Sequence, residues 1–544
     1  PTTSPPTDHM RPSVPEAGRV TVGDRLRTAR RLGWIDPGRV AATATALARW
    51  GPTLASACAA AATRYPDRVA VVDHRASLTY AELDRRSTEL ANGFASLDLG
   101  DQEHIGVLCA NNADFVEVSV AAAKAGLPVV YLNTGFGAPQ LGEVLAREGV
   151  TALVADVDLL EVVDATAFRG TVLAADGAPP HRGHRSLADL RLLHPSRRLR
   201  PTLPVAPVLL TSGTTGVPKG ARRSARAVDP SAALALLEMI PYESGDIAVI
   251  PTPLFHAWGL TQLSIAIGTA STSVLVRRFD PAATLSAVHE HRATVLALVP
   301  VMIRRLLASE HLAATDTAAL RIVASSGSAL AAGAALEWMN RVGDTLYTLS
   351  GSTEVGQATI ATPADLRAAP GTAGRVVPGI SVEIVDSNGD AVAAGEQGRI
   401  MVGGRGQFSG YTGGGTKEML RGRMATGDVG YFDRDQRLFV TGRADDMIVS
   451  GAENVYPQEV EDLLLTIDGV DDCAVAGVPD EEFGQRLKAW IVAAPNARLD
   501  PEEIRSLVAR DLARHKVPRD IAFVDTLPRT NTGKLRRGAL TDRS

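Results

Sequence analysis

The chain has 544 residues, 45% of them hydrophobic, which is more than a single hydrophobic core of roughly 250–300 residues accommodates. At least two domains are therefore expected. The 56 basic and 61 acidic residues leave a net charge of −5, so no overall positive field favours nucleic acid or an anionic membrane. Cys58, Cys109 and Cys473 lie too far apart in sequence for a disulfide framework or a paired-cysteine metal site, and they favour a reducing, cytoplasmic environment.

No segment has the composition of a membrane-spanning helix. The apolar stretches that begin near residues 41 and 248 are interrupted by charged, proline and histidine residues, and neither provides the roughly 18 uninterrupted apolar residues that a span requires. The first residues are rich in Pro, Ser and Thr and lack the apolar core of a signal peptide. We expect residues 1–35 to be disordered or peripheral.

The following part of the chain alternates between helical and strand-like patterns. Residues 36–65 are rich in alanine and predict helix, residues 68–73 are β-branched and predict a strand, and residues 78–97 have helical periodicity. An apolar strand follows at 105–110 and a further helix at 114–125. Buried strands that alternate with helices are typical of a parallel sheet covered on both faces.

This alternation continues and then changes near residue 372. Further strands are predicted at 128–133, 151–156, 205–210, 247–252 and 273–278. From about 372 the strands are short and separated by glycines, which indicates a small antiparallel β subdomain. Residues 442–544 combine helical and strand patterns and predict a small α+β domain. The expected fold is therefore α/β: a large N-terminal domain over residues 36–441, with sheets flanked by helices and the small β subdomain, and a small C-terminal domain over 442–544.

The sharpest motif is LLTSGTTGVPKG at residues 209–220, where a buried strand runs into a loop of Ser, Thr and Gly. Glycine permits close approach, backbone N–H groups and hydroxyls can surround phosphate oxygens, and Lys219 adds positive charge. The string is not a Walker A motif, because Pro218 stands where that motif requires glycine. A Gly/Ser/Thr run alone is equally typical of a surface loop, but the full string is much more specific.

Further strings follow along the chain. They are LYTLSGSTEVG at 346–356, ATGDVGYFD at 425–433, TGRADDMIVSGAENVYPQEVE at 441–461 and LPRTNTGKLRR at 527–537. Together the motifs resemble the adenylate-forming superfamily of acyl-CoA synthetases, nonribosomal-peptide adenylation domains and luciferase, and are most similar to bacterial fatty-acyl-CoA synthetases. The resemblance implies ATP, Mg²⁺ and coenzyme A as cofactors, and a C-terminal domain that moves relative to the large one.

The resemblance also implies the nucleotide contacts. The expected nucleotide-binding residues are Thr211, Ser212, Gly213, Thr214, Thr215, Gly216, Lys219, Gly327, Ser328, Ser350, Gly351, Ser352, Thr353, Asp428, Arg443 and Lys534. By resemblance, Thr353 contacts the α-phosphate and Glu354 holds Mg²⁺, a hard cation that prefers oxygen ligands. The family usually places an aromatic residue against adenine where this chain has Ser350, so the packing of adenine must differ here or be supplied by another side chain.

The remaining roles near the C-terminus rest on the same resemblance. Asp428 is similar to the residue that accepts hydrogen bonds from both ribose hydroxyls, and Arg443 is expected to reach the same ribose. Asp445 aligns with the hinge of the small domain, and residues 451–453 with the loop that enters the site for the thiol step. Lys534 is the expected catalytic lysine, which bridges the substrate carboxylate and an ATP phosphate.

Two further segments belong to the expected pocket. His256, in PLFHAWG, lies by resemblance near the acyl entrance, and Gly327 and Ser328 lie beside adenine and the acyl group. The expected catalytic residues are Lys534, Thr353, Glu354, Lys219 and His256, with Glu354 as the metal ligand. The HEH triplet at 289–291 lacks further ligands at zinc spacing, and no GxSxG string occurs, so the metalloprotease and hydrolase interpretations have no basis.

The motifs therefore predict a two-step acid–thiol ligase. A carboxylate is ionised at neutral pH and can attack the α-phosphate of ATP without a general base. Pyrophosphate leaves, the acyl group passes to coenzyme A, and AMP is released. We expect a fatty acid or a hydrophobic aryl acid as substrate, no nucleic-acid partner, and a homodimer as one oligomeric state to test. Two alternatives stay open: an adenylating enzyme with a carrier-protein thiol or an amine as acceptor, including nitrite-activating chemistry like that of diazotases, and a degenerate nucleotide-binding regulator.

Overall fold

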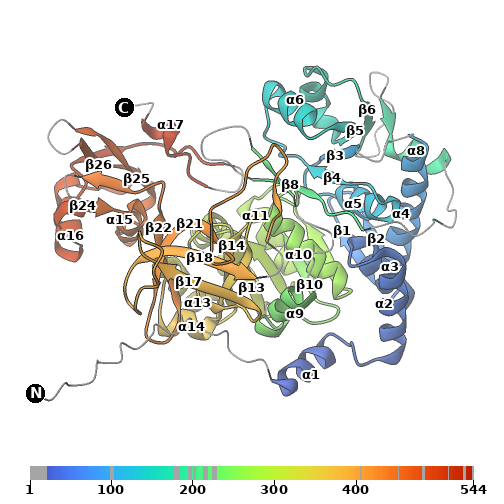
Figure 1. Ribbon diagram of the computed structural model, residues 1–544, viewed down its shortest axis with the longest axis horizontal. Helices are drawn as coiled ribbons and strands as arrows, with labels where there is room; N and C mark the ends of the chain where they lie inside the picture. Colours follow the sequence, from blue (N-terminus) through green and yellow to red (C-terminus); the bar gives the residue numbers. More distant parts are fainter. Residues whose placement is uncertain are drawn as a thin grey trace, which may run out of the picture.

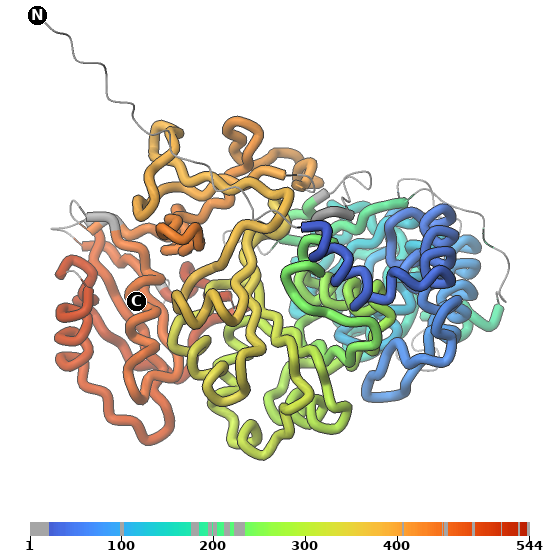
Figure 2. Tube along the Cα trace, turned by 90° about the horizontal axis from the view of Figure 1, so that it is seen from below, coloured from blue at the N-terminus to red at the C-terminus, as the bar shows by residue number. Residues whose placement is uncertain are grey.

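The described chain forms a large N-terminal part with a smaller C-terminal part beside it (Figures 1 and 2). The computed structural model describes residues 21–97, 103–175, 184–193, 199, 204–211, 218–222, 230–404, 407–450, 453–480, 484–512, 514–530 and 534–541. Within these residues, no helix has both the length and the apolar composition needed to cross a bilayer. Cys58, Cys109 and Cys473 are buried and free.

The first sheet of the large part has eight strands in the order β19-β9-β8-β4-β3-β5-β6-β7. The strands are β3 (His104–Leu108), β4 (Val129–Tyr131), β5 (Val150–Ala155), β6 (Thr171–Ala174), β7 (Arg185–Ser186), β8 (Val208–Leu210), β9 (Gly220–Arg222) and β19 (Gly410–Tyr411). The pairs among β3 to β8 are parallel, whereas β9 is antiparallel to β8 and to β19. The Gly/Ser/Thr loop is the segment of sequence that connects β8 to β9.

The second sheet has nine strands in the order β16-β15-β14-β13-β12-β10-β11-β1-β2. The strands are β1 (Val69–Val72), β2 (Ser77–Thr79), β10 (Ile247–Ile250), β11 (Thr272–Leu275), β12 (Val295–Leu298), β13 (Ile322–Ser326), β14 (Leu346–Ser352), β15 (Gly356–Ala361) and β16 (Arg375–Val376). Its centre is parallel and both of its edges are antiparallel. The strands of this region therefore form two sheets, each with a mainly parallel centre.

A layer of helices lies between the two sheets and buries the main core. These helices are α3 (Leu54–Arg64), α4 (Tyr80–Ala95), α5 (Ala113–Ala125) and α10 (Ala257–Gly268). Their apolar side chains share one core with strands from both sheets. Asn112 starts α5 by accepting a hydrogen bond from the backbone N–H of Phe115 at 2.9 Å, which explains the change from strand to helix there.

The other helices of the large part lie around the sheets. They are α1 (Val22–Arg31), α2 (Pro37–Trp50), α6 (Ala138–Arg147), α7 (Leu160–Asp164), α8 (Leu187–Leu193), α9 (Pro230–Met239), α11 (Pro281–Glu290), α12 (Pro300–Leu307), α13 (Ala332–Val342) and α14 (Pro363–Ala368). The helix predicted over 36–65 is two helices, because Gly51 has φ 62° after α2 and Pro52 follows it. Helix α1 lies within the segment expected to be disordered or peripheral, and Arg25 pairs there with Glu238 of α9.

The short strands after residue 372 form an antiparallel sheet in the order β17-β18-β21-β20, with β22 on β21. Their bounds are β17 (Ile380–Val385), β18 (Gly398–Gly404), β20 (Met419–Leu420), β21 (Arg423–Phe432) and β22 (Leu438–Arg443). The predicted antiparallel β subdomain is thus confirmed. Strand β21 carries Asp428, and strand β22 ends at Arg443.

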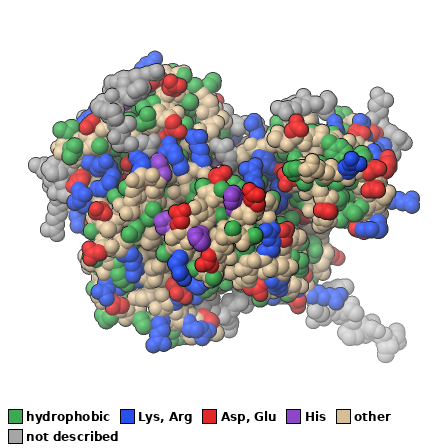
Figure 3. All heavy atoms as spheres, turned by 180° about the vertical axis from the view of Figure 1, so that it is seen from behind, with side chains coloured by type: hydrophobic (Ala, Val, Ile, Leu, Met, Phe, Trp, Pro, Cys, Tyr) green, Lys and Arg blue, Asp and Glu red, His purple; other side chains and the backbone are tan. Residues whose placement is uncertain are grey.

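The C-terminal part is a small α+β unit. It contains β23 (Ile448–Ser450), β24 (Glu453–Val455), α15 (Pro457–Leu464), β25 (Val470–Asp480), β26 (Gly484–Ala493), α16 (Pro501–Asp511), β27 (Asp520–Phe523) and α17 (Gly538–Thr541). This unit and the large part confirm the predicted fold class, while the boundary at residue 441 stays a prediction. On the face in Figure 3, acidic and basic side chains are interspersed, in keeping with the nearly balanced charge.

Candidate active site

One large cavity, with a volume of about 1830 Å³, is lined by residues from both parts of the chain. Every expected site residue that the structure describes lines it, namely Thr211, Lys219, His256, Gly327, Ser328, Ser350, Gly351, Ser352, Thr353, Glu354, Asp428, Arg443 and Lys534. The expected residues Ser212, Gly213, Thr214, Thr215 and Gly216, and positions 451 and 452 of the expected thiol-step loop, lie outside the described residues. The volume exceeds the roughly 300–1,000 Å³ that is usual for a small-molecule site.

The two ends of the Gly/Ser/Thr loop are held together at the sheet. The backbone N–H of Thr211 donates to the carbonyl of Lys219 at 2.9 Å, and its hydroxyl donates to the same oxygen at 3.1 Å. The Lys219 ammonium lies 5.5 Å from the ring centroid of Tyr411, within the range of a cation–π contact. The base of the loop therefore presents a lysine to the cavity from the position directly before β9.

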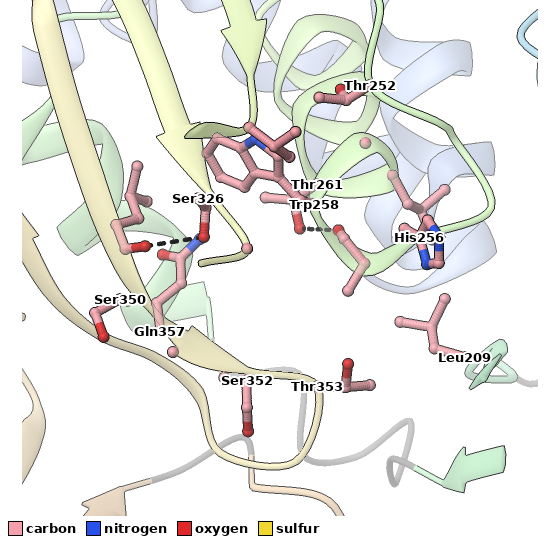
Figure 4. A pocket seen from close by; sticks show the side chains of 18 of the residues that line it. Leu209, Thr252, His256, Trp258, Thr261, Ser326, Ser350, Ser352, Thr353 and Gln357 are labelled. Carbon is pink, nitrogen blue, oxygen red and sulfur yellow. Dashed lines mark hydrogen bonds between the residues drawn. The ribbon is translucent and has the colours of Figure 1, made fainter. Parts of the chain in front are cut away.

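The turn between β14 and β15 carries Ser352, Thr353 and Glu354. A Cβ on Gly351 would lie 2.0 Å from the carbonyl oxygen of Gly356, so this crossing requires glycine. The Ser352 hydroxyl accepts the N–H groups of Glu354 at 3.2 Å and of the next residue at 3.3 Å, and so shapes the turn. In Figure 4, Thr353 points into the space on the side of Leu209, whereas Ser352 points away from it.

Glu354 is 8% exposed and has two polar neighbours that the sequence did not indicate. The Tyr411 hydroxyl donates to its Oε1 at 2.8 Å, and the Lys417 ammonium lies 3.9 Å from the same oxygen. Burial acts to raise the pKa of Glu354, but Lys417 and the hydrogen bonds from Tyr411 and Ser352 outweigh it and hold the pKa below its ordinary value. An ionised carboxylate facing a nucleotide-sized cavity fits the predicted Mg²⁺ ligand, since Mg²⁺ commonly takes one or two carboxylates plus phosphates.

Asp428 and Arg443 face each other across the β21–β22 pair. Their Oδ1 and Nη1 atoms are 3.2 Å apart, and Arg443 also makes two hydrogen bonds to Asp445, at 2.9 and 3.2 Å. Gly427 has φ 86°, and a Cβ there would lie 2.8 Å from the Arg443 guanidinium. Burial raises the pKa of Asp428, while Arg443 and Lys417 act against this. The expected ribose residue and the expected hinge residue thus share one arginine.

Lys534 enters the cavity from the C-terminal part. Its backbone N–H donates to the Thr530 hydroxyl at 3.1 Å, within a turn that Thr530 closes by donating to the Lys534 carbonyl. The side chain is exposed to the cavity, yet the protein around it desolvates the amine and lowers its pKa, as does Arg443. Asp428 and Glu354 act in the opposite direction and raise the pKa of the amine, so both carboxylates and the guanidinium lie within electrostatic range of it.

His256 precedes α10 and is held by the loop before it. The backbone N–H of Leu254 donates to Asn111 Oδ1 at 2.9 Å, which fixes this loop to the segment between β3 and α5. Burial, and secondarily the charge of Lys534, lower the pKa of His256 to about 3, so the ring is neutral at physiological pH. Within the described part of the chain its buried Nε2 makes no hydrogen bond. Figure 4 shows the ring between Thr261 and Leu209, at the cavity wall.

The cavity continues from this point between α3, α5 and α10. In Figure 4, Ser326, Trp258 and Gln357 surround the space on one side of Thr353. Beyond them the lining is mainly small or apolar and includes Ala57, Ala60, Ala123, Leu237, Ser264, Ile265 and Gly268. The predicted nucleotide contacts are therefore joined to a second, apolar region that no motif had indicated.

Comparisons with known proteins agree with this arrangement. Residues 58–412 match the family model of the AMP-binding enzyme, and residues 459–534 match that of the AMP-binding enzyme C-terminal domain. A feruloyl-CoA synthase from Amycolatopsis sp is 34% identical over 492 residues, covering 88% of this chain and 96% of that protein. A fatty acid–[acyl-carrier-protein] ligase from Streptomyces coeruleorubidus is 29% identical, covering 88% of this chain and 94% of that protein. An amide bond synthetase structure from Marinactinospora thermotolerans is 28% identical with a TM-score of 0.78, covering 88% and 97%.

The fold and the cavity define an adenylate-forming enzyme. The chain belongs to the AMP-binding enzyme family, within its acid–CoA ligases. The predicted superfamily is therefore confirmed, and the predicted cofactors ATP, Mg²⁺ and coenzyme A are those of this group.

Proposed function

We propose that the chain activates a fatty acid or a hydrophobic aryl acid with ATP and transfers the acyl group to coenzyme A. The observation that carries this proposal is the position of Lys534. Although it comes from the C-terminal part, it shares one cavity with Glu354, Asp428 and Arg443 of the large part. This cavity also opens into the apolar region, so an activated carboxylate and its hydrophobic tail have places in one continuous site.

In the first step the substrate carboxylate attacks the α-phosphorus of ATP, and the bond to pyrophosphate breaks. Both reactants are anions, so the main requirement is charge neutralisation and alignment. Lys534 provides positive charge between the carboxylate and the phosphate, and the phosphates of bound ATP raise its pKa again. Lys219 and the loop after Thr211 hold the leaving pyrophosphate. Mg²⁺, when bound at Glu354, supplies further positive charge against the phosphates.

Asp428 has the role of holding the ribose. An ionised carboxylate is a pure acceptor and can take both ribose hydroxyls. Burial raises the pKa of Asp428, and Arg443, 3.2 Å away, opposes that rise and favours the charged form. In the second step, the C-terminal part turns about Asp445, Lys534 leaves, and the thiol of coenzyme A attacks the acyl carbonyl with loss of AMP. Asp445 is paired with Arg443 in the arrangement that places Lys534 in the cavity.

The apolar region supports a hydrophobic acid as substrate. Ala57 and Ala60 on α3 and Ala123 on α5 leave space where larger side chains would close it. Each buried CH₂ group contributes about 0.8 kcal/mol, so a long alkyl chain gains considerable binding energy here. A small polar acid gains nothing from this region.

A substitution that fills the apolar region tests the proposed acid class. Ala57→Phe should lower kcat/KM for long-chain saturated acids by at least about tenfold while changing that for short acids less than threefold, because only the long chains reach α3. Thr63→Phe, on the exposed side of the same helix, is the matched control. Equal losses for short and long acids, or no activity with any fatty or aryl acid, would contradict the proposal.

The relatives also support a competing function, in which the acyl group passes to an acceptor other than coenzyme A. One similar protein is named a ligase of fatty acid to acyl-carrier protein, and another an amide bond synthetase. A carrier thiol or an amine could replace coenzyme A without changing the first step. The regulator alternative has less support, because the cavity keeps Lys219, Glu354, Asp428, Arg443 and Lys534 together.

A further inference from the structure

A lysine that no motif indicated, Lys417, lies among the charged residues of the cavity. A run of glycines brings it there from β19. Gly414 and Gly415 have φ values of 88° and 87°, which only glycine adopts readily, and the Tyr411 N–H donates to the Gly415 carbonyl at 3.1 Å. The chain therefore turns sharply after Tyr411 and returns to the cavity at Lys417.

The position of the Lys417 ammonium is set by β21. Its Nζ donates to the carbonyl oxygen of Thr426 at 2.8 Å, two residues before Asp428. The distance to Glu354 Oε1 is 3.9 Å, which is an ion-pair contact but too long for a hydrogen bond. An ammonium has three donors, and within the described part of the chain only Thr426 takes one. The side chain is 21% exposed, on a residue that lines the cavity.

The ammonium is close enough to affect several of the proposed functional groups. Lys417 is the main group that opposes the effect of burial on the pKa of Glu354. It also acts on the pKa of Asp428, after burial and Arg443, and on that of Lys534, after burial, Arg443, Asp428 and Glu354. A single cation therefore lies within electrostatic range of the proposed metal ligand, the proposed ribose ligand and the proposed catalytic lysine.

We propose that Lys417 is a further nucleotide-binding residue, whose ammonium contacts a phosphate oxygen of ATP beside Glu354. The triphosphate carries the largest negative charge that enters this cavity, and the Lys417 ammonium belongs to the cavity lining, 3.9 Å from Glu354 Oε1. The 3.9 Å separation leaves Glu354 without a hydrogen bond from this ammonium, so a phosphate oxygen is the stronger acceptor for it. The contact adds to those expected of Lys219, Lys534 and Arg443.

Direct binding of two probes tests this role. ATP in the presence of EDTA, and adenosine, are titrated into the full chain by calorimetry. Lys417→Met should raise the Kd for ATP about tenfold, the usual size for a lost charged hydrogen bond, and leave the Kd for adenosine unchanged. Lys417→Arg should stay within about threefold of the parent for ATP, since it keeps the charge.

The control and the second variant separate this role from a structural one. Glu418→Gln changes the neighbouring charge, which pairs with Arg399 and does not line the cavity, and should leave both constants unchanged. Lys417→Gln keeps a hydrogen-bond donor for the Thr426 carbonyl but lacks the charge, and it should raise the Kd for ATP as Lys417→Met does. The proposal would be overturned if Lys417→Met and Lys417→Gln left the Kd for ATP unchanged, or if they raised the Kd for ATP and the Kd for adenosine equally.

Discussion

The contact between the two parts of the chain offers the sharpest quantitative prediction. Arg304 of α12 in the large part lies 3.0 Å from Asp472 of β25 in the C-terminal part. Arg529, which directly precedes the turn from Thr530 to Lys534, holds the same carboxylate with two hydrogen bonds at 2.8 and 2.7 Å. This contact is present while Lys534 lies in the cavity, so it should stabilise the arrangement that performs adenylation.

The substitution Arg304→Met removes the contact across the interface and leaves Asp472 paired with Arg529. The two side chains are 21% and 17% exposed, so the contact is partly shielded from solvent. A charged hydrogen bond in such a place contributes about 1.5 kcal/mol, which corresponds to about tenfold in the equilibrium between the two domain arrangements. The adenylation rate should therefore fall by up to about tenfold, in proportion to the competent fraction.

The assay compares the two half-reactions. Adenylation is followed by pyrophosphate exchange, and thioester formation by supplying the acyl-adenylate with coenzyme A. Arg304→Met should slow the first and spare the second, and a double-mutant cycle with Asp472→Asn should give a coupling of about 1–2 kcal/mol. Arg305→Met, the exposed neighbour on α12, is the control. Arg304 also lines the cavity. Equal loss in both half-reactions, or no coupling to Asp472, would therefore mean that Arg304 acts in the cavity and not through the contact between the two parts of the chain, and would refute this reasoning.

Two more predictions concern the chemistry and the pH dependence. Lys534→Ala should lower adenylation by at least about a hundredfold and leave thioester formation from supplied acyl-adenylate within about threefold; stopped-flow assays of each step check this, and equal loss of both contradicts the two-arrangement mechanism. His256 has a pKa of about 3 in the folded chain and an ordinary value near 6.5 when unfolded, so the unfolded state takes up a proton first and stability falls as the pH drops below about 6.5. Between pH 7.5 and 5 this proton uptake lowers the free energy of unfolding of the parent by about 2 kcal/mol. His256→Asn lacks this group, so its urea midpoint should fall less over that pH range than the midpoint of the parent. The same fall in both proteins contradicts the assignment.

Much of the site could be predicted because its residues lie in contiguous strings. Two such strings are residues 209–220, with a strand, a loop and a lysine, and residues 350–354, which form a turn. Residues within one short string stay close together whatever the order of the strands in the sheets. The neighbours of Glu354 could not be predicted in this way. Tyr411 is 57 positions from it, and the two meet only because β19 pairs with β9 on the edge of the first sheet.

The fold shows the same limit. Alternation of strand and helix predicted parallel pairing, but the order of the strands and their division into two sheets depend on contacts between distant segments. The apolar region is formed in this way, from α3, α5 and α10 packed between the sheets. Alanines on α3 predicted only a helix, since nothing in their spacing tells a packed helix face from one that borders a cavity.

The central claim is that an acid is activated at this site and passed to coenzyme A. The most direct measurement is mass spectrometry of the products after incubation of the chain with ATP, Mg²⁺ and a panel of saturated fatty acids and hydroxycinnamic acids, with and without coenzyme A. We predict AMP, pyrophosphate and an acyl-CoA thioester for at least one hydrophobic acid, with AMP release that depends on coenzyme A. AMP formation that is indifferent to coenzyme A, with no thioester detected, would contradict the claim.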